Sequence, residues 1–251
     1  MRKTLKYRIY PTKETERKLF WTLSRCRELY NAALSERKDA YKYAGKSVTY
    51  YDQQNDLPEI KTEIRQEYQD IAAHVLQDVL RRLDRAFQNF FRRCKHGENP
   101  GFPRFQGRNR YESFTYPDGA GWKLTIEEQG KKLTGTLHLS KIGKAKVRLH
   151  RPLEGKIKTV TIKREVDEWY VTFSCEVEEP PKLPVSYEDV GIDLGVTHLA
   201  TLSNGEMIEH PRYYRKAQKV LEKRQQALAR KKRGSHRREK ARRRWQKPTA
   251  R

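Results

Sequence analysis

The segment Gly191-Ile192-Asp193-Leu194-Gly195-Val196 places one carboxylate in a short apolar strand between two glycines. A charge in such a strand is costly to bury unless a cation or hydrogen bonds compensate it. The glycines leave room for a metal ion, a phosphate or another backbone to approach. The following residues 197–203 run into an Asn204-Gly205 turn, which predicts a β-hairpin. Asp193 is therefore the first candidate for a chemically active residue.

A carboxylate that supports phosphodiester hydrolysis normally shares two divalent ions, about 4 Å apart, with other carboxylates. Mg²⁺ prefers such oxygen ligands. The acids that follow Asp193 are Glu206, Glu209, Glu222 and Glu239. The first two lie at or just after the hairpin turn, and the other two lie among Lys and Arg, where surface ion pairs are expected. None is a convincing second ligand, so a strand-end carboxylate bonded to backbone amides remains the alternative for Asp193.

The overall charge favours a polyanionic partner. The chain has 55 Lys and Arg against 32 acids, a formal net charge of +23, and a sequence pI of about 10.0. Nucleic acid is the commonest partner of so basic a protein, although ribosome-associated and merely cationic soluble proteins share this balance. Residues 211–251 hold 18 Lys or Arg and two acids, so they contribute +16 of the +23. We expect the final stretch to stay disordered unless phosphates neutralise it.

The three cysteines lie far apart in the sequence and form no Cys-x-x-C pair. We therefore expect no zinc site built from cysteines, and a reducing compartment. The N-terminal residues lack the apolar core of a signal peptide. No run approaches the roughly 18 apolar residues that a membrane helix needs. These features predict a cytoplasmic or nucleoid-associated protein with no membrane partner.

Alternation over residues 3–10 predicts a strand, and Thr12 is a suitable cap for a helix that follows. A stripe of residues at spacings of three and four, which runs from Leu19 through Arg37 to Tyr41, predicts a helix from 12 to 41 that packs along this stripe. A second stripe predicts another packed helix from about 70 to 93. Six short strands are predicted at residues 113–116, 122–127, 132–139, 146–150, 158–164 and 169–177. They indicate a small barrel or curled sheet, which the strand at 3–10 joins, with the helices as an insertion.

The last part of the chain is predicted to be separate. The proline-rich residues 180–184 form a stiff linker and the best domain boundary. A basic helix is expected from Tyr213 to about Lys232.

Basic and aromatic residues fit contact with nucleic acid in several places. In the glycine- and proline-rich stretch 94–109, Arg104 lies between Phe102 and Phe105, where the rings can stack on bases and the cation can hold a phosphate. The equally weighted alternative is that these phenylalanines are core residues. A basic hairpin and the tail can neutralise phosphates without reading sequence. The nucleic-acid-binding candidates are Arg8, Arg104, Arg108, Lys144, Lys146, Arg148, Arg151, Arg215, Lys231, Lys232, Arg233, Arg237 and Arg238.

Eight stretches, taken in order, resemble TnpB, the OrfB-type protein of bacterial insertion sequences and ancestor of type V CRISPR effectors. They are residues 7–12, 29–34, 83–91, 101–105, 147–157, 191–195, 211–217 and 229–235. The resemblance implies an α+β fold with three parts. These are a wedge-like β-barrel at 1–11 and 110–180, a helical recognition lobe with a basic loop at 12–109, and the start of an RNase H-like (RuvC) nuclease domain with a basic tail at 181–251.

Members of that family are transposon-associated, RNA-guided DNA endonucleases of prokaryotes. The resemblance implies that a guide RNA from the end of the element pairs with the target DNA. In this arrangement the protein supplies a positively charged surface that holds the nucleic acid by its shape. The resemblance also implies Mg²⁺ as cofactor, with Asp193 as the catalytic first metal ligand.

The family pattern contains a later glutamate, a final aspartate and a zinc-binding Cys-x-x-C insertion, none of which these 251 residues include. We therefore expect a C-terminally truncated, incomplete nuclease domain that does not bind Mg²⁺ competently, binds no zinc and does not cut DNA by itself. Two alternatives are a non-catalytic guide-RNA- or DNA-binding regulator and a degenerate transposase remnant.

Overall fold

The computed structural model describes residues 1–108, 110–129, 132–179, 181 and 189–246. The chain divides into two compact units, Met1–Glu179 and Pro180–Arg251. Most of the predicted linker at 180–184 lies outside the described residues. No helix in the described part of the chain is both long and apolar enough to cross a membrane.

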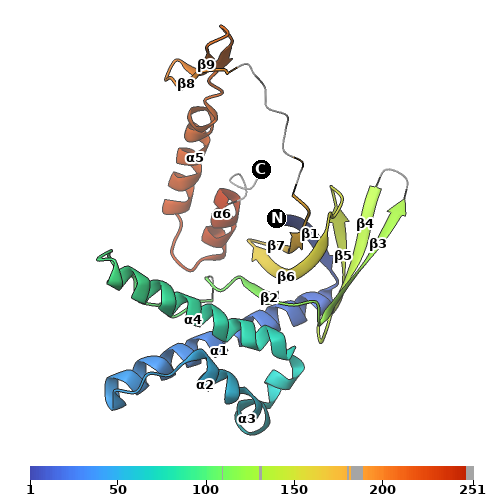
Figure 1. Cartoon of the computed structure of the whole chain (residues 1–251), viewed down its shortest axis with the longest axis vertical. Helices are drawn as coiled ribbons and strands as arrows, with labels where there is room; N and C mark the ends of the chain where they lie inside the picture. The colour runs from blue at the N-terminus through green and yellow to red at the C-terminus, as the bar shows by residue number, and fades with distance from the viewer. Residues whose placement is uncertain (109, 130–131, 180, 182–188, 247–251) are drawn as a thin grey trace. The chain divides into compact units, whose positions relative to one another are not determined.

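The first unit is built on a seven-stranded antiparallel sheet in the order β2-β6-β7-β1-β5-β4-β3 (Figure 1). The strands are β1 (Arg2–Pro11), β2 (Ser113–Tyr116), β3 (Trp122–Gln129), β4 (Lys132–Leu139), β5 (Gly143–Leu149), β6 (Lys156–Glu165) and β7 (Glu168–Glu176). The N-terminal strand lies between β7 and β5, in the middle of the sheet. This confirms that it joins strands more than 100 residues later, with the helices inserted between them.

The sheet is curled, as Figure 1 shows. Within the described residues no hydrogen-bonded pairing joins its two outer strands, β2 and β3. The curled sheet is thus confirmed, and its closure into a barrel is not observed in this part of the chain.

Strict alternation explains which face of the sheet enters the core, because successive side chains of a strand point to opposite faces. In β1, Leu5, Tyr7 and Ile9 are buried, while the residues between them face outward. β5 alternates in the same way and directs its charged residues away from the core.

Two long helices pack against each other and against this sheet: α1 (Lys13–Ala44) and α4 (Ala73–Lys95). The predicted cap of α1 is confirmed, since Thr12 Oγ1 accepts a 3.2 Å hydrogen bond from the backbone nitrogen of Thr15. Between them lie α2 (Tyr50–Asn55), α3 (Leu57–Glu59), the π-helical turn η1 (Ile60–Ile64) and the 3-10 turn η2 (Gln66–Asp70). The prediction that Tyr41 continues the buried stripe of α1 is wrong, because burial in this helix ends at Arg37 and Tyr41 is 71% exposed.

The second unit contains a three-stranded sheet, β10-β9-β8, followed by two helices. Its elements are β8 (Ile192–Asp193), β9 (His198–Leu202), β10 (Met207–Glu209), α5 (Tyr213–Ala229) and α6 (His236–Gln246). The predicted hairpin is confirmed, with Gly205 at φ +90° in its turn. Ala200 is the one buried residue among those described in this unit.

Helix α6 lies where the charge density predicts disorder. Ser235 Oγ accepts a 3.2 Å hydrogen bond from the backbone nitrogen of Arg238 and so caps the helix. Glu239 Oε1 lies 3.0 Å from Arg243 Nη2 one turn further on. A cap and an ion pair at i,i+4 both favour helix, which the charge count alone did not take into account.

Candidate nucleic-acid interface

The outer faces of β3, β4 and β5 form one polar surface, called here the β3–β5 face. Residues directly opposite one another on neighbouring strands point to the same side of a sheet. The register therefore arranges this face in three rows. They are Lys123, His138 and Lys144; Thr125, Thr136 and Lys146; and Glu127, Thr134 and Arg148. Cations and hydroxyl groups dominate the rows, and these are the groups that hold phosphate oxygens.

The β5 cations differ from several cations of β1 and β6 in having no acid partner. Among the described residues, Lys144, Lys146 and Arg148 form no ion pair. Four cations of β1 and β6 do: Lys3 with Glu154 at 2.6 Å, Lys6 with Glu165 at 2.6 Å, Lys158 with Glu176 at 2.7 Å, and Lys163 with Glu165 at 3.0 Å. The sheet thus neutralises part of its own charge around β1 and β6 and leaves the positive charge of β5 available to a polyanion.

The predicted contact Arg8 lies at the border between these two regions. It is opposite Arg148 in the register of β1 and β5. Its Nη2 lies 3.0 Å from Glu168 Oε1, and its guanidinium lies 4.9 Å from the centre of the Tyr10 ring. Arg8 is therefore already engaged by an acid and a ring, unlike the cations of β5.

Arg151 lies in the loop that follows β5, and its side chain is exposed. The hydroxyl of Tyr7 donates a 3.1 Å hydrogen bond to the Arg151 carbonyl oxygen. Burial raises the pKa of the Tyr7 hydroxyl, so it keeps its proton and acts as a donor. The core thereby fixes the backbone from which the Arg151 side chain extends.

The basic loop at 96–108 is tied to α1 by a pair of hydrogen bonds. The side-chain amide of Asn31 donates to the Gln106 carbonyl at 3.0 Å and accepts from the Gln106 backbone nitrogen at 2.7 Å. Phe102 and Phe105 are 46% and 49% exposed, so the alternative that they are core residues is wrong. Arg104 and Arg108 are exposed and form no ion pair with a described residue.

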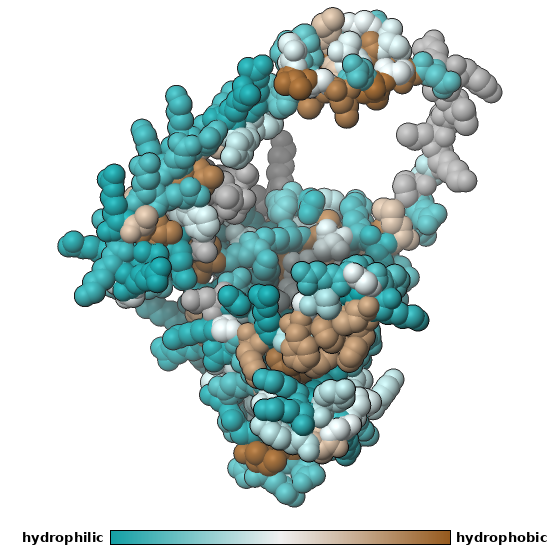
Figure 2. Space-filling model, turned by 90° about the vertical axis from the view of Figure 1, so that its left-hand side faces the viewer, coloured by the Kyte–Doolittle hydropathy of each residue, from teal (hydrophilic) through white to brown (hydrophobic). Residues whose placement is uncertain are grey.

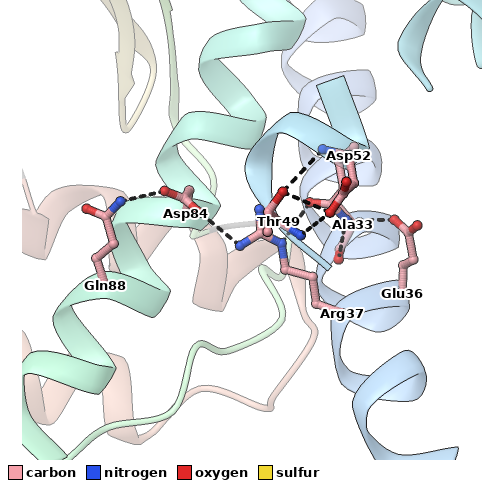
Figure 3. Close-up of polar contacts among 8 residues, drawn as sticks. Ala33, Glu36, Arg37, Thr49, Asp52, Asp84 and Gln88 are labelled. Atoms are coloured by element: carbon pink, nitrogen blue, oxygen red, sulfur yellow. Dashed lines mark hydrogen bonds and ion pairs between the residues drawn. The ribbon is translucent and has the colours of Figure 1, made fainter. Parts of the chain in front are cut away.

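A buried polar network joins α1, α2 and α4 (Figure 3). Arg37 donates from Nε to Gln53 Oε1 at 2.8 Å and from Nη1 to Asp84 Oδ1 at 3.1 Å. Gln53 in turn donates from Nε2 to the Ala33 carbonyl at 2.9 Å and to Glu36 Oε2 at 2.6 Å. Helical spacing placed Arg37 on the buried stripe, but it could not reveal the partners, which come from two other helices.

A hollow of about 390 Å³ lies beside this network, between α1 and the segment from α2 to η1. Apolar side chains line most of it, but Glu36, Asp56 and Glu59 also contribute. Three carboxylates disfavour phosphate groups by charge repulsion. The hollow is therefore not part of the candidate interface.

In the second unit, Asp193 is exposed on β8, opposite Thr201 of β9. Its carboxylate makes no hydrogen bond or ion pair with a described residue, so the alternative of a carboxylate bonded to backbone amides is not seen. No group of three or more His, Cys, Asp or Glu that could hold a metal ion occurs in the described part of the chain. One carboxylate does not fit a two-ion Mg²⁺ site, and the ligand role of Asp193 stays a prediction.

The candidates in the tail fall into two groups. Arg215, Lys231, Lys232, Arg233 and Arg237 have exposed side chains that form no ion pair among the described residues. Arg238 instead donates from Nη1 to the carbonyls of Leu228 at 3.3 Å and Lys231 at 2.9 Å. Since these carbonyls lie at and just beyond the end of α5, Arg238 stabilises the helix terminus and is less available to phosphate.

Two sequence-family models match the chain. OrfB_IS605, described as "Probable transposase", matches residues 172–251, and HTH_OrfB_IS605, described as "Helix-turn-helix domain", matches residues 1–46. The chain is thus similar to the OrfB_IS605 proteins in both of these regions. This confirms the resemblance seen in the sequence motifs. In this chain, residues 1–46 form one strand and one long helix, rather than two helices joined by a turn.

Two curated relatives carry names that describe an activity. "Putative RNA-guided DNA endonuclease InsQ" of Escherichia coli (strain K12) is 30% identical over 227 residues, covering 90% of this chain and 53% of the relative. "Putative RNA-guided DNA endonuclease" of Streptomyces pristinaespiralis is 35% identical over 255 residues, covering 97% and 58%. The chain thus spans somewhat more than half the length of these relatives.

Solved structures show a weaker likeness. A chain of the "Cryo-EM structure of the Cas12f1-sgRNA-target DNA complex" is 15% identical with a TM-score of 0.39, covering 92% of this chain and 62% of that one. A chain of the "Cryo-EM structure of CRISPR-Cas12f Ternary Complex" is 13% identical with a TM-score of 0.46, covering 88% and 54%.

Proposed function

We propose that this chain carries the guide-RNA- and target-DNA-binding part of a transposon-associated, RNA-guided DNA endonuclease. The observation that carries the proposal is the unneutralised positive charge of Lys144, Lys146 and Arg148 on the β3–β5 face. The names of the two curated relatives support the choice of RNA and DNA as the polyanions. In this proposal the curled sheet and its inserted helices are the wedge-like barrel and recognition lobe, and residues 181–251 begin a RuvC-like domain.

The geometry of β5 suits a phosphate backbone. Alternate residues of a strand are about 6.8 Å apart, so its three cations cover roughly 14 Å along one line. The hydroxyls of Thr125, Thr134 and Thr136 lie on the same face and can donate to phosphate or ribose oxygens. Such contacts position a nucleic acid without reading its sequence, and base pairing with the guide supplies the sequence.

A charge-matched pair of triple variants tests this binding surface. Lys144→Gln, Lys146→Gln and Arg148→Gln together remove three unpaired cations, whereas Lys3→Gln, Lys6→Gln and Lys158→Gln remove three that are paired with acids. Both triple variants lower the net charge equally. We expect the first to reduce the slope of log affinity against log salt by about 2–3 on an RNA hairpin, and the second to change it little. Equal losses in both variants, or no nucleic-acid binding by the unmodified chain, would overturn the proposal.

We also propose that Asp193 is one ligand of a divalent ion and that cleavage needs further carboxylates. The support is that the described residues contain no group of three or more His, Cys, Asp or Glu that could hold a metal ion, so no further ligands accompany Asp193 there. The purified chain, incubated with element-end RNA, matching DNA and Mg²⁺, should leave the DNA intact. Guide-dependent cleavage that disappears in Asp193→Ala would show that the chain has a complete site.

A further inference from the structure

Helix α4 continues its apolar pattern beyond the core. Its first half buries five apolar residues, the last of which is Leu83. Phe87 packs at the margin of the core, and Phe90 and Phe91 follow outside it. Phe91 is 61% exposed. An apolar stripe normally ends where its packing partners end, so these last rings need another explanation.

The exposed rings form one cluster with a residue of the basic loop. Phe102 lies edge-on to Phe90, with ring centres 5.2 Å apart, and to Phe87, at 5.6 Å. Phe91 contacts Phe90 at 5.3 Å and lies nearly parallel to Phe87 at 6.2 Å. These four residues, Phe87, Phe90, Phe91 and Phe102, are called here the aromatic platform. Figure 2 faces the C-terminal end of α4 and shows a contiguous hydrophobic patch on the first unit, bordered by hydrophilic side chains.

The platform is preformed. The hydrogen bonds between Asn31 and Gln106 hold the loop against α1, and Pro103, the neighbour of Phe102, is buried. Phe102 therefore meets the end of α4 from a fixed backbone. A ligand that binds here does not have to order the loop first, which lowers the entropic cost of binding.

The surroundings of the platform select the kind of partner. The cations of the α4 end and the loop are Arg92, Arg93, Lys95, Arg104 and Arg108. Glu98 is the acid among residues 92–108, and it lies 3.9 Å from Arg93. An apolar patch of this kind marks an interaction site, and a rim of this charge favours a polyanion over another basic surface.

We propose that the aromatic platform stacks on the unpaired bases of a single-stranded nucleic acid while the basic rim holds its phosphates. Unpaired strands offer base faces and phosphates together, whereas the bases of a duplex are stacked on one another and inaccessible to these rings. The inference rests on the proposed function and adds a division of labour. The β3–β5 face binds phosphates of any strand, and the platform favours strands that are not paired.

A double variant of the full chain that removes two rings tests the platform. In Phe91→Leu/Phe102→Leu the patch stays apolar and the charge is unchanged. We expect its affinity for a short labelled oligo(dT) to fall about five- to tenfold. This fold-change corresponds to the lower part of the range of free energies that one stacked base contributes. Its affinity for a duplex of equal length should change less than about twofold, with the same salt slope.

The matched control is Phe20→Leu, since Phe20 is also a partly exposed ring but contacts Trp169 away from the platform. It should leave both affinities unchanged. Circular dichroism confirms that each variant is folded. Equal losses on single strand and duplex, or no loss in a folded double variant, would overturn the platform while leaving the proposed function standing.

Failure of the proposed function gives a different result, because the unmodified chain then binds neither polymer. A third outcome also overturns the platform: the unmodified chain self-associates at assay concentration and Phe91→Leu/Phe102→Leu makes it monomeric. The patch would then be the contact between two copies of the chain.

Discussion

The two units of this chain differ in how they hide their apolar residues. In the first unit a continuous core joins the sheet to α1 and α4, and side chains such as Leu83 and Phe173 are fully buried. In the second unit Leu194 is 76% and Val196 is 88% exposed, and the brown patch at the top of Figure 2 lies over this part of the chain. Both sequences contain regular apolar strands. The difference teaches that a strand pattern alone does not provide the partners that bury it.

The largest expected effect separates the two units as folding entities. Residues 1–179 expressed alone should melt cooperatively within about 3 °C of the full chain, because their core does not depend on the rest. Residues 189–246 alone should show no cooperative transition, since burial of apolar surface is the main stabilising term of a fold and little occurs there. Calorimetry measures both. A sharp transition in the short fragment would show that its exposed strands are stable without further partners.

A matched pair of leucine truncations sharpens the comparison within the full chain. Leu83→Ala leaves a cavity between α4 and its neighbours and should destabilise the first unit by about 3–5 kcal/mol. Leu194→Ala removes the same atoms from an exposed position and should change stability by less than about 0.5 kcal/mol. Urea denaturation followed by far-UV circular dichroism measures the two values. If Leu194→Ala cost as much as Leu83→Ala, the second unit would have a core comparable to the first.

A smaller effect is expected from the polar network of the first unit. Arg37→Met removes the cation that pairs with Asp84 and the donor to Gln53 Oε1. It should cost about 2–3 kcal/mol, because Asp84 keeps part of its solvent contact and its hydrogen bond from Gln88. The double variant Arg37→Met/Asp84→Leu should recover some of that loss, since no charge is then left unpaired. In the second unit Glu239→Gln breaks an exposed pair and should have no measurable effect. A double variant that is no more stable than Arg37→Met alone would contradict this account.

A further small effect depends on pH. Burial raises the pKa of the Glu165 carboxyl, but hydrogen bonds from Lys6 and Lys163 outweigh this and hold it below its usual value. A carboxyl with a lowered pKa in the folded state adds stability above its unfolded pKa of about 4.3 and loses it as the pH falls through the folded value. Glu165→Gln should therefore lower stability at pH 7 by less than about 1 kcal/mol and make no difference at pH 2. A cost that is the same at both pH values would rule out charge as its cause.

Local signals in the sequence were enough to place most elements. The Thr12 cap, the Asn204-Gly205 turn and the alternation of residues 3–10 each act within a few residues, and each was found as predicted. Position Tyr41 was predicted wrongly because helical spacing continues after the packing partners of α1 end. Phe102 and Phe105 were ambiguous for a related reason, since a phenylalanine in a loop can equally cover a core or stay exposed.

Sequence alone determined most of the elements, the side of each long strand that faces the core, the family resemblance and the positive charge, because these depend on residue type and short spacing. Only the tertiary structure decided which cations remain free. Lys6 and Lys146 look alike in the sequence, but Lys6 lies 2.6 Å from an acid 159 residues away and Lys146 has no acid partner among the described residues. Pairing of this kind is set by which strands lie side by side, and that is a property of the fold rather than of any stretch of residues.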